Sequence, residues 1–122
     1  MSISKERLKA WRDRNPERRL LNAARQRSKK YGVKFTLRLE HIVIPTRCPV
    51  LGIRIHRAMR TPTTKWNSPS IDRVDPKRGY TPSNIVICSF KANWLKRDAT
   101  VEELEKLARF YRKWKEKQRV QG

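Results

Sequence analysis

The sequence is poor in cysteine, glycine and acidic residues, and it has no long apolar run. Only two cysteines, Cys48 and Cys88, occur in 122 residues, too few for the disulfide framework that stabilises many small secreted domains. The first residues do not have the pattern of a signal peptide. No apolar stretch approaches the roughly 20 residues that a membrane-spanning helix needs. These absences argue against a secreted or membrane-embedded protein, and we expect a cytoplasmic location.

Positive charge dominates what is present. The chain has 31 lysine and arginine residues against 11 aspartate and glutamate residues, a net charge of +20. Such a surplus repels itself unless a polyanion or counterions neutralise it. A solvated surface and an anionic membrane leaflet are the other interpretations. Because the basic residues run from Lys5 to Arg119 and are interleaved with four tryptophans, we expect a basic face that binds nucleic acid, and no membrane partner.

The length fits one compact domain with an appended arm. Residues 4–14 have a helical composition. Asn15-Pro16-Glu17 then predicts the start of a second helix, with Asn15 as its cap and Pro16 at the first helical position. Gly32 supplies the left-handed residue that ends this helix.

We therefore divide the chain into a basic N-terminal helical arm, residues 1–32, and a domain, residues 33–122. The arm has more positive charge than core contacts require, so we expect it to lie along a phosphate backbone. Its candidate nucleic-acid-binding residues are Arg18, Arg19, Arg25, Lys29 and Lys30.

The middle of the chain predicts two short strands followed by a helix. The β-like runs cover residues 70–74 and 84–88 and are separated by a turn, and Ser89 can cap a helix that continues to about Arg97. Residues 36–44 fit either a strand or a helical turn. Residues 48–70 are rich in Pro, Gly, Thr and Ser, which is typical of a loop. The predicted fold class is α+β.

A last helix begins at Thr100, where Thr100-Val101-Glu102-Glu103 forms a capping box. Apolar residues then recur at helical spacing. They are Val101, Leu104, Leu107, Ala108, Tyr111 and Trp114. We interpret them as the core-facing stripe of an amphipathic helix.

Three polar residues lie in a suggestive arrangement in the strand-strand-helix pattern: Asp72 in the first run, Asn84 at the start of the second, and Asn93 inside the helix. A strand and a facing helix can bring a carboxylate and an amide oxygen together, and hard cations take such ligands. We predict that Asp72 and Asn93 hold one Mg²⁺ or Mn²⁺ ion. The basic residues expected to hold a scissile phosphate beside it are Arg73, Lys91, Lys96 and Arg97.

Three segments have a recognisable order: Ser70-Ile71-Asp72-Arg73-Val74-Asp75, then Gly79-Tyr80-Thr81-Pro82-Ser83-Asn84-Ile85, then Lys91-Ala92-Asn93-Trp94-Leu95-Lys96. Together they resemble the HNH, or ββα-metal, nuclease core of many small phage proteins. Segments 15–19, 48–53 and 98–104 are also similar to that group, so the resemblance covers about residues 15–111. It implies a metal-dependent DNA endonuclease with a small ββα-metal core, acting in the host cytoplasm if the chain is encoded by a phage.

The resemblance also implies roles for single residues. Asp72 matches the metal-binding acid that precedes the catalytic histidine of the family. Asn84 matches the central asparagine, which orients the backbone of the site. Asn93 matches the final metal-binding residue.

The chain departs from the family at the general base. The position after Asp72 is Arg73, whose guanidinium stays protonated and cannot accept a proton from water. Asp75, His56 or His41 could take that role, the attack could proceed without a protein base, or cleavage has been lost while DNA binding persists. We favour a weak or unusual nuclease, because oxygen donors fill both metal positions.

A structural zinc is not expected. Many HNH proteins hold zinc with two Cys-x-x-Cys pairs, but here each pair retains one cysteine, Cys48 and Cys88. Two thiolates are too few for the usual four-ligand site. Completion by His41 or His56 remains open, and we expect the two cysteines to lie in the core.

The sequence therefore predicts a DNA endonuclease that acts on duplex, nicked or branched DNA. Its catalytic candidates are Asp72, Arg73, Asp75, Asn84 and Asn93. Trp66, in a basic loop, is a candidate for contact with nucleic acid. The alternatives are a non-catalytic nucleic-acid-binding protein with an HNH scaffold and an RNA-associated basic protein. A homodimer is compatible with the sequence.

Overall fold

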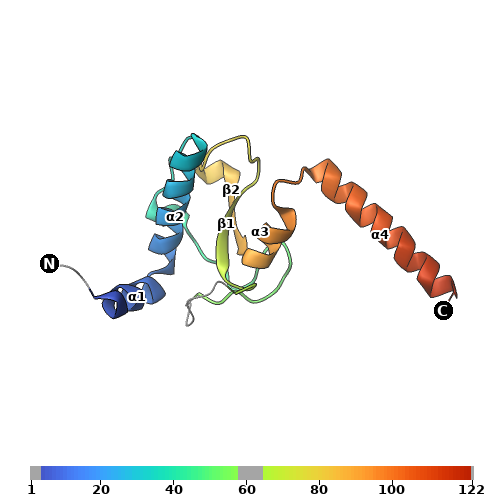
Figure 1. Cartoon of the computed structure of the whole chain (residues 1–122), viewed down its shortest axis with the longest axis horizontal. Helices are drawn as coiled ribbons and strands as arrows, with labels where there is room; N and C mark the ends of the chain where they lie inside the picture. The colour runs from blue at the N-terminus through green and yellow to red at the C-terminus, as the bar shows by residue number, and fades with distance from the viewer. Residues whose placement is uncertain (1–3, 58–64, 122) are drawn as a thin grey trace.

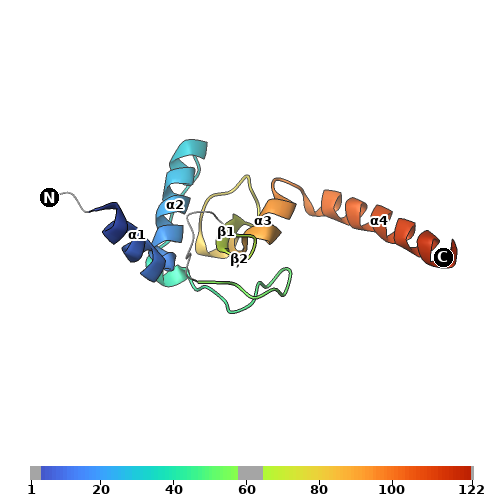
Figure 2. The ribbon, with the colours of Figure 1, turned by 60° about the horizontal axis from the view of Figure 1, so that its bottom comes forward.

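The structure, a computed structural model, describes residues 4–57 and 65–121. Its elements are α1 (Lys5–Arg14), α2 (Pro16–Tyr31), η1 (Leu39–His41), β1 (Pro69–Arg73), η2 (Pro82–Asn84), β2 (Ile85–Ser89), α3 (Phe90–Lys96) and α4 (Val101–Gln121). The two strands form an antiparallel sheet that lies between α2 and α3 (Figure 1, Figure 2). The predicted α+β class is confirmed. Part of the loop expected between the first cysteine and β1, residues 58–64, lies outside the described residues.

Helix α2 begins and ends where the sequence predicts. Pro16 occupies its first turn, and Gly32 ends it with a left-handed φ of 64°. Asn15 differs from the prediction, since its side chain makes no capping hydrogen bond. Proline at the first helical position fixes φ there and has no N–H, so the first turn has one fewer unpaired backbone donor.

The main core lies between α2 and the sheet. Leu21 and Ala24 of α2 pack with Ile71 of β1 and Ile87 of β2. Burial of these apolar side chains is what holds a strongly basic helix against the strands. Helix α2 therefore shares one core with the residues that follow it, rather than forming a separate arm.

The ambiguous segment 36–44 forms only the short 3₁₀ turn η1. Leu37 and Ile42 are buried, whereas Leu39 is exposed. The backbone at the start of this segment lies against the turn that precedes β2. The Tyr80 N–H donates to the Lys34 carbonyl at 2.8 Å, and the Thr36 N–H donates to the Tyr80 carbonyl at 3.0 Å. A Cβ at the adjacent Gly79 would collide with the Lys34 carbonyl, so glycine is required there.

The hairpin leads directly into α3. In the register of the sheet Asp72 pairs with Val86 and Ser70 with Cys88. Ser89 then ends β2 and caps α3, because its side-chain oxygen accepts a hydrogen bond from the Ala92 N–H at 3.1 Å. The predicted order of strand, turn, strand and capped helix is confirmed.

Helix α4 corrects one prediction. Thr100 and Glu103 form the expected capping box, but the apolar stripe does not face the core. Leu104 is half-buried, and every other α4 residue of assigned exposure is exposed. The helix projects away from α3 (Figure 1). Periodicity identifies an apolar face but not the surface that covers it. Neither α4 nor any other described helix combines the length and apolar content that would cross a membrane.

Candidate functional site

The hairpin and α3 bring Asp72 and Asn93 to one pocket. Asp72 comes from β1 and Asn93 from α3, and both line a cavity of about 190 Å³. Three arginines line the same cavity, namely Arg27, Arg73 and Arg97. The two predicted metal ligands thus share a pocket in which positive charge predominates.

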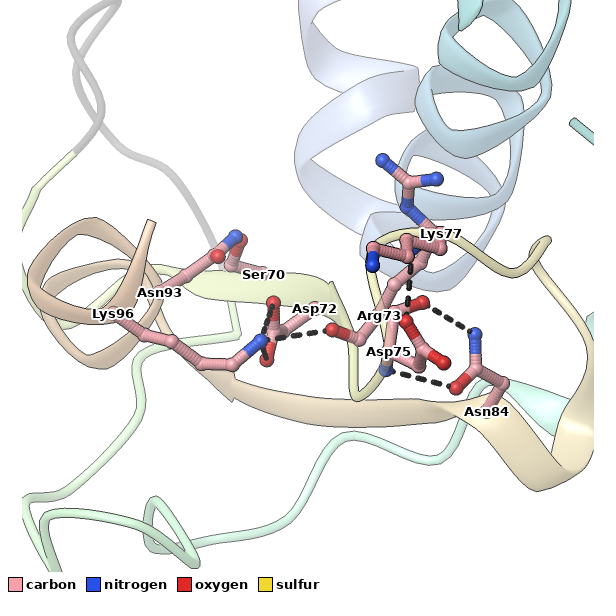
Figure 3. A network of polar contacts seen from close by, with 8 residues as sticks. All are labelled: Ser70, Asp72, Arg73, Asp75, Lys77, Asn84, Asn93 and Lys96. Atoms are coloured by element: carbon pink, nitrogen blue, oxygen red, sulfur yellow. Dashed lines mark hydrogen bonds and ion pairs between the residues drawn. The ribbon is translucent and has the colours of Figure 1, made fainter. Parts of the chain in front are cut away.

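The Asp72 carboxylate is engaged by Lys96. The Lys96 ammonium lies 3.2 Å from Asp72 Oδ1 and 3.0 Å from Oδ2, and it also donates to the Arg73 carbonyl at 2.9 Å. Figure 3 shows Lys96 reaching from α3 to the carboxylate on β1. The two side chains are 22% and 11% exposed, so the pair is largely shielded from water. Lys96 was predicted to contact phosphate, and in this structure it neutralises Asp72.

Asn93 is oriented by the neighbouring strand. Its amide nitrogen donates to Ser70 Oγ at 2.8 Å. This contact uses the nitrogen end of the amide, which leaves the oxygen end as the one suited to a cation. Asn93 is half-buried on the side of α3 that faces the sheet.

Arg73 contacts two aromatic rings and a backbone carbonyl at the edge of the pocket. Its guanidinium lies 5.0 Å from the centre of the Tyr80 ring and 5.6 Å from that of Tyr31, and it donates to the Arg78 carbonyl at 3.1 Å. Cation–π contacts of this kind fix the plane of the guanidinium. The residue that replaces the expected histidine is therefore ordered beside Asp72, in a place where it can meet a phosphate.

Arg97 has the one left-handed backbone among the described residues other than glycine, with a φ of 47°. It follows α3, and its guanidinium lies 4.5 Å from the Trp94 ring centre while it lines the pocket. A residue with a Cβ is strained in this region of φ. Such strain often occurs where a side chain has a functional position.

Asn84 and Asp75 lie in the turn rather than in the pocket. Asn84 Oδ1 accepts from the Asp75 N–H at 3.0 Å, and its nitrogen donates to the carbonyls of Asp75 and Gly79 at 3.1 and 2.9 Å. Asp75 Oδ1 accepts from the Lys77 N–H. The Asn84 side chain thus bonds the backbone of the turn at three points. Asp75 holds the turn and is not among the pocket-lining residues, so it is badly placed to act as a base.

Neither histidine is among the pocket-lining residues. His41 Nδ1 accepts a hydrogen bond from the Arg38 N–H within the η1 turn. His56 is exposed, and its backbone N–H donates to the Asn67 carbonyl. Neither histidine therefore lies where it could act as the general base in the pocket.

A second hollow extends the pocket between α2 and β1. It measures about 320 Å³ and shares Arg27, Ile71 and Asn93 with the first, while Arg19 extends it along α2. The other predicted basic residues of α2 are exposed on the helix: Arg18, Arg25, Lys29 and Lys30. The arrangement forms a groove lined by guanidinium groups that a nucleic-acid backbone could follow.

Arg27, Tyr31 and Tyr80 are pocket residues that were not selected from the sequence as site residues. For two of them a signal existed. Leu20, Ala24, Arg27 and Tyr31 follow the spacing of one helix face, so a basic and an aromatic residue at the end of the core-facing row mark the edge of the core. Tyr80 had no comparable signal.

Lys91 and Trp66 lie together outside the pocket. The Lys91 ammonium is 6.0 Å from the Trp66 ring centre, and the Lys91 backbone N–H donates to the Trp66 carbonyl at 2.9 Å. Trp66 and Trp94 are both more than half exposed. Exposed aromatic rings beside cations suit base stacking on single-stranded or unpaired nucleic acid.

The two cysteines lie in a second apolar cluster with Ala92. Burial acts to raise the pKa of the Cys48 thiol, but hydrogen bonds from Ser89 and from the backbone of Leu51 outweigh it and lower this pKa to about 7. Burial raises the pKa of Cys88 to about 12, and the negative charge of Asp72 adds to the effect. In the described part of the chain no three His, Cys, Asp or Glu residues are grouped as a metal site would require.

The Cys88 shift predicts a loss of stability in alkali that Cys88→Ala should reduce. The unfolded thiol loses its proton near pH 9, whereas the folded thiol keeps it until about pH 12. The folded state is therefore favoured below pH 9 and loses this contribution between pH 9 and 12. Urea unfolding midpoints at stepped pH values should fall less steeply above pH 9 in Cys88→Ala than in the wild type.

Cys48→Ala is the matched control. Its lowered pKa stabilises the fold increasingly as pH rises from about 7 to 9, so this variant should lose that rise and keep the alkaline fall. Identical slopes above pH 9 in the wild type and in Cys88→Ala would contradict the assignment.

Comparison with known proteins does not place the chain in a family. No family model matches the sequence. No curated protein and no solved structure matches it either. The function is therefore inferred from the geometry of the pocket and from the sequence pattern.

Proposed function

We propose that this chain is a metal-dependent DNA endonuclease whose hairpin and α3 bind and hydrolyse a phosphodiester. The observation that carries the proposal is the meeting of Asp72 and Asn93 in one pocket with three arginines. A carboxylate and an amide oxygen suit a hard divalent cation, and guanidinium groups suit phosphate oxygens. The resemblance of residues 70–96 to the HNH core supports the same assignment.

The donor set fits one Mg²⁺ or Mn²⁺ ion, subject to a competition. Asp72 and Asn93 are the residues that would hold the ion, but Lys96 already neutralises the Asp72 carboxylate. A cation that binds Asp72 must displace this ammonium. The displaced Lys96 is then available to a phosphate oxygen at the same place.

The surrounding side chains have separate roles in this proposal. Arg73, fixed by two tyrosine rings, and Arg97, placed by its strained backbone, bind the phosphate and stabilise the charge that builds on it. A bound cation would lower the pKa of the attacking water, which matters because no histidine is among the described residues that line the pocket. Asn84 stabilises the conformation of the turn that follows Arg73 through its hydrogen bonds to the backbone of Asp75 and Gly79.

The proposed substrate is DNA, and phosphate contacts of this type do not distinguish duplex, nicked and branched forms. Branched substrates such as Holliday junctions belong in the test because some phage enzymes that the sequence resembles resolve junctions. Structured RNA belongs there as a competitor, since preference for it would favour an RNA-associated protein.

A second candidate is a nucleic-acid clamp without catalysis. The Lys96 ammonium favours it, because this group provides the Asp72 carboxylate with a permanent cation. In that case the arginines bind phosphate and no metal is needed. The alternative keeps the same interface and differs only in the absence of hydrolysis.

Cleavage assays separate the two candidates. Labelled plasmid and junction DNA are incubated with the protein in Mg²⁺, in Mn²⁺ and in EDTA. Cuts that require a divalent ion support the endonuclease. Salt-sensitive binding without cuts in any ion rejects it in favour of the clamp.

Substituting Lys96 by methionine is expected to increase the affinity for Mn²⁺ by about tenfold or more. The ammonium donates charge-assisted hydrogen bonds to Asp72, and each such bond contributes about 1.5–3 kcal/mol. In the variant Mn²⁺ binds Asp72 without having to break these bonds. Titration calorimetry, or electron paramagnetic resonance of free Mn²⁺, measures the change.

Lys91→Met is the matched control, since Lys91 is an exposed lysine of the same helix that lies beside Trp66. It should leave Mn²⁺ affinity unchanged. If neither variant nor the wild type binds Mn²⁺, the competition between ammonium and cation is refuted.

A further inference from the structure

The exposed apolar face of α4 has no partner among the described residues. Leu107, Tyr111 and Trp114 are 55%, 61% and 54% exposed. With Leu104 they follow the alternating three- and four-residue spacing of a coiled-coil seam. A helix gains most of its stability in water from packing of such a face. The helix of 21 residues therefore has a surface suited to another helix.

The charge of α4 is divided along its length. Residues 101–108 contain three glutamates and one lysine, a net charge of −2, whereas residues 109–121 contain six basic residues and one glutamate, a net charge of +5. A second copy in antiparallel orientation places each acidic half against a basic half. A parallel copy would instead bring the two basic halves together, which is unfavourable.

The positions that flank the seam agree with the antiparallel orientation. Glu103 and Lys117 lie two heptads apart on the same flank of the seam, given its period of seven. In an antiparallel pair centred near Arg109, Glu103 of one copy lies close to Lys117 of the other, and the symmetry repeats the contact. Leu104 then packs near Trp114 of the other copy, and Leu107 near Tyr111.

We infer that α4 is a dimerisation helix that pairs with α4 of a second copy of this chain in antiparallel orientation. The partner is chosen by charge complementarity as well as by the apolar face. A long basic stretch of DNA-binding helix would not require the row of leucine and aromatic residues. The pairing depends on α4 alone and is independent of whether the pocket cleaves DNA.

The oligomeric state of the full chain tests this inference. After nucleic acid has been removed in high salt, sedimentation or light scattering over a range of concentrations should give twice the chain mass of 14.6 kDa. Leu107→Glu should weaken dimerisation by about a hundredfold or more, because it removes one buried leucine from each copy. A wild type that is monomeric at every concentration overturns the inference. This holds also if the monomer uses α4 to bind DNA.

The orientation is tested by charge. Lys117→Glu sets two glutamates against each other at both ends of an antiparallel pair and should weaken dimerisation about tenfold at physiological salt. Adding Glu103→Gln should restore much of the lost affinity, because it removes the repulsion between the two glutamates. Glutamine still accepts the capping hydrogen bond from the Thr100 N–H, so the start of α4 is preserved.

Arg109→Glu is the matched control. It makes the same charge change on the opposite face of α4 and should have little effect. Circular dichroism confirms that each variant is folded. Equal effects of Lys117→Glu and Arg109→Glu, or a dimer insensitive to Leu107→Glu, would overturn the antiparallel pairing.

Discussion

Replacing Asn84 with aspartate is expected to lower the free energy of unfolding by about 3 kcal/mol or more. Asn84 is only 2% exposed, and its amide nitrogen donates to the carbonyl oxygens of Asp75 and Gly79. In the aspartate variant an oxygen takes the place of that nitrogen and faces two acceptors. The buried carboxylate would keep only the hydrogen bond from the Asp75 N–H, which is too little to offset the desolvation of its charge.

The loss should appear as a decrease of about 10 °C or more in the thermal midpoint. Circular dichroism and urea unfolding measure it. Asn22→Asp is the control, since Asn22 is exposed on α2 and undergoes the same chemical change with little effect on stability. If Asn84→Asp unfolds at the wild-type midpoint, the turn between the strands does not depend on this side chain.

Replacing Asp72 with asparagine is expected to reduce metal-dependent cleavage by about a thousandfold, if the proposed endonuclease activity is present. The carboxylate is the charged ligand proposed for the cation, and metal catalysis contributes several kcal/mol to such reactions. The amide oxygen of asparagine can still accept a hydrogen bond from Lys96, so the fold should be largely preserved. Cleavage rates in Mn²⁺ and DNA affinity are measured on the same preparations.

Two matched carboxylates serve as controls for Asp72→Asn. Asp98→Asn changes an exposed residue just after α3. Asp75→Asn changes the turn residue that accepts from the Lys77 N–H, a contact that asparagine also makes. Both variants should cut at nearly the wild-type rate. Loss of activity in Asp75→Asn with intact stability would restore Asp75 as a base, and full activity in Asp72→Asn would remove Asp72 from the site.

Local sequence signals predicted the elements next to the pocket well. Ser89 caps α3 through its own side chain, Gly32 ends α2 with a left-handed φ, and Thr100 with Glu103 starts α4. Each of these signals acts over one helical turn and needs no distant partner. The two short β-like runs, residues 70–74 and 84–88, with a turn between them, likewise predicted the hairpin.

The pocket itself was predicted only in part. The sequence suggested that Asp72 and Asn93 meet, and they line one cavity. It did not indicate that Lys96 would pair with the Asp72 carboxylate or that Tyr31 and Tyr80 would both contact Arg73. These contacts join residues from α2, the sheet and α3, and their distances depend on how the three layers pack.

The sequence by itself determined the excess of positive charge, the α+β class, the ends of α2 and α3 and the start of α4, since composition, period and capping are local. Tertiary structure alone decided that Asp72 is paired with Lys96 and that the apolar stripe of α4 is exposed. The physical reason is common to both. The charge and hydrophobicity of a side chain determine which kind of partner it favours. Which residue becomes that partner depends on the packing of segments that are distant in the chain.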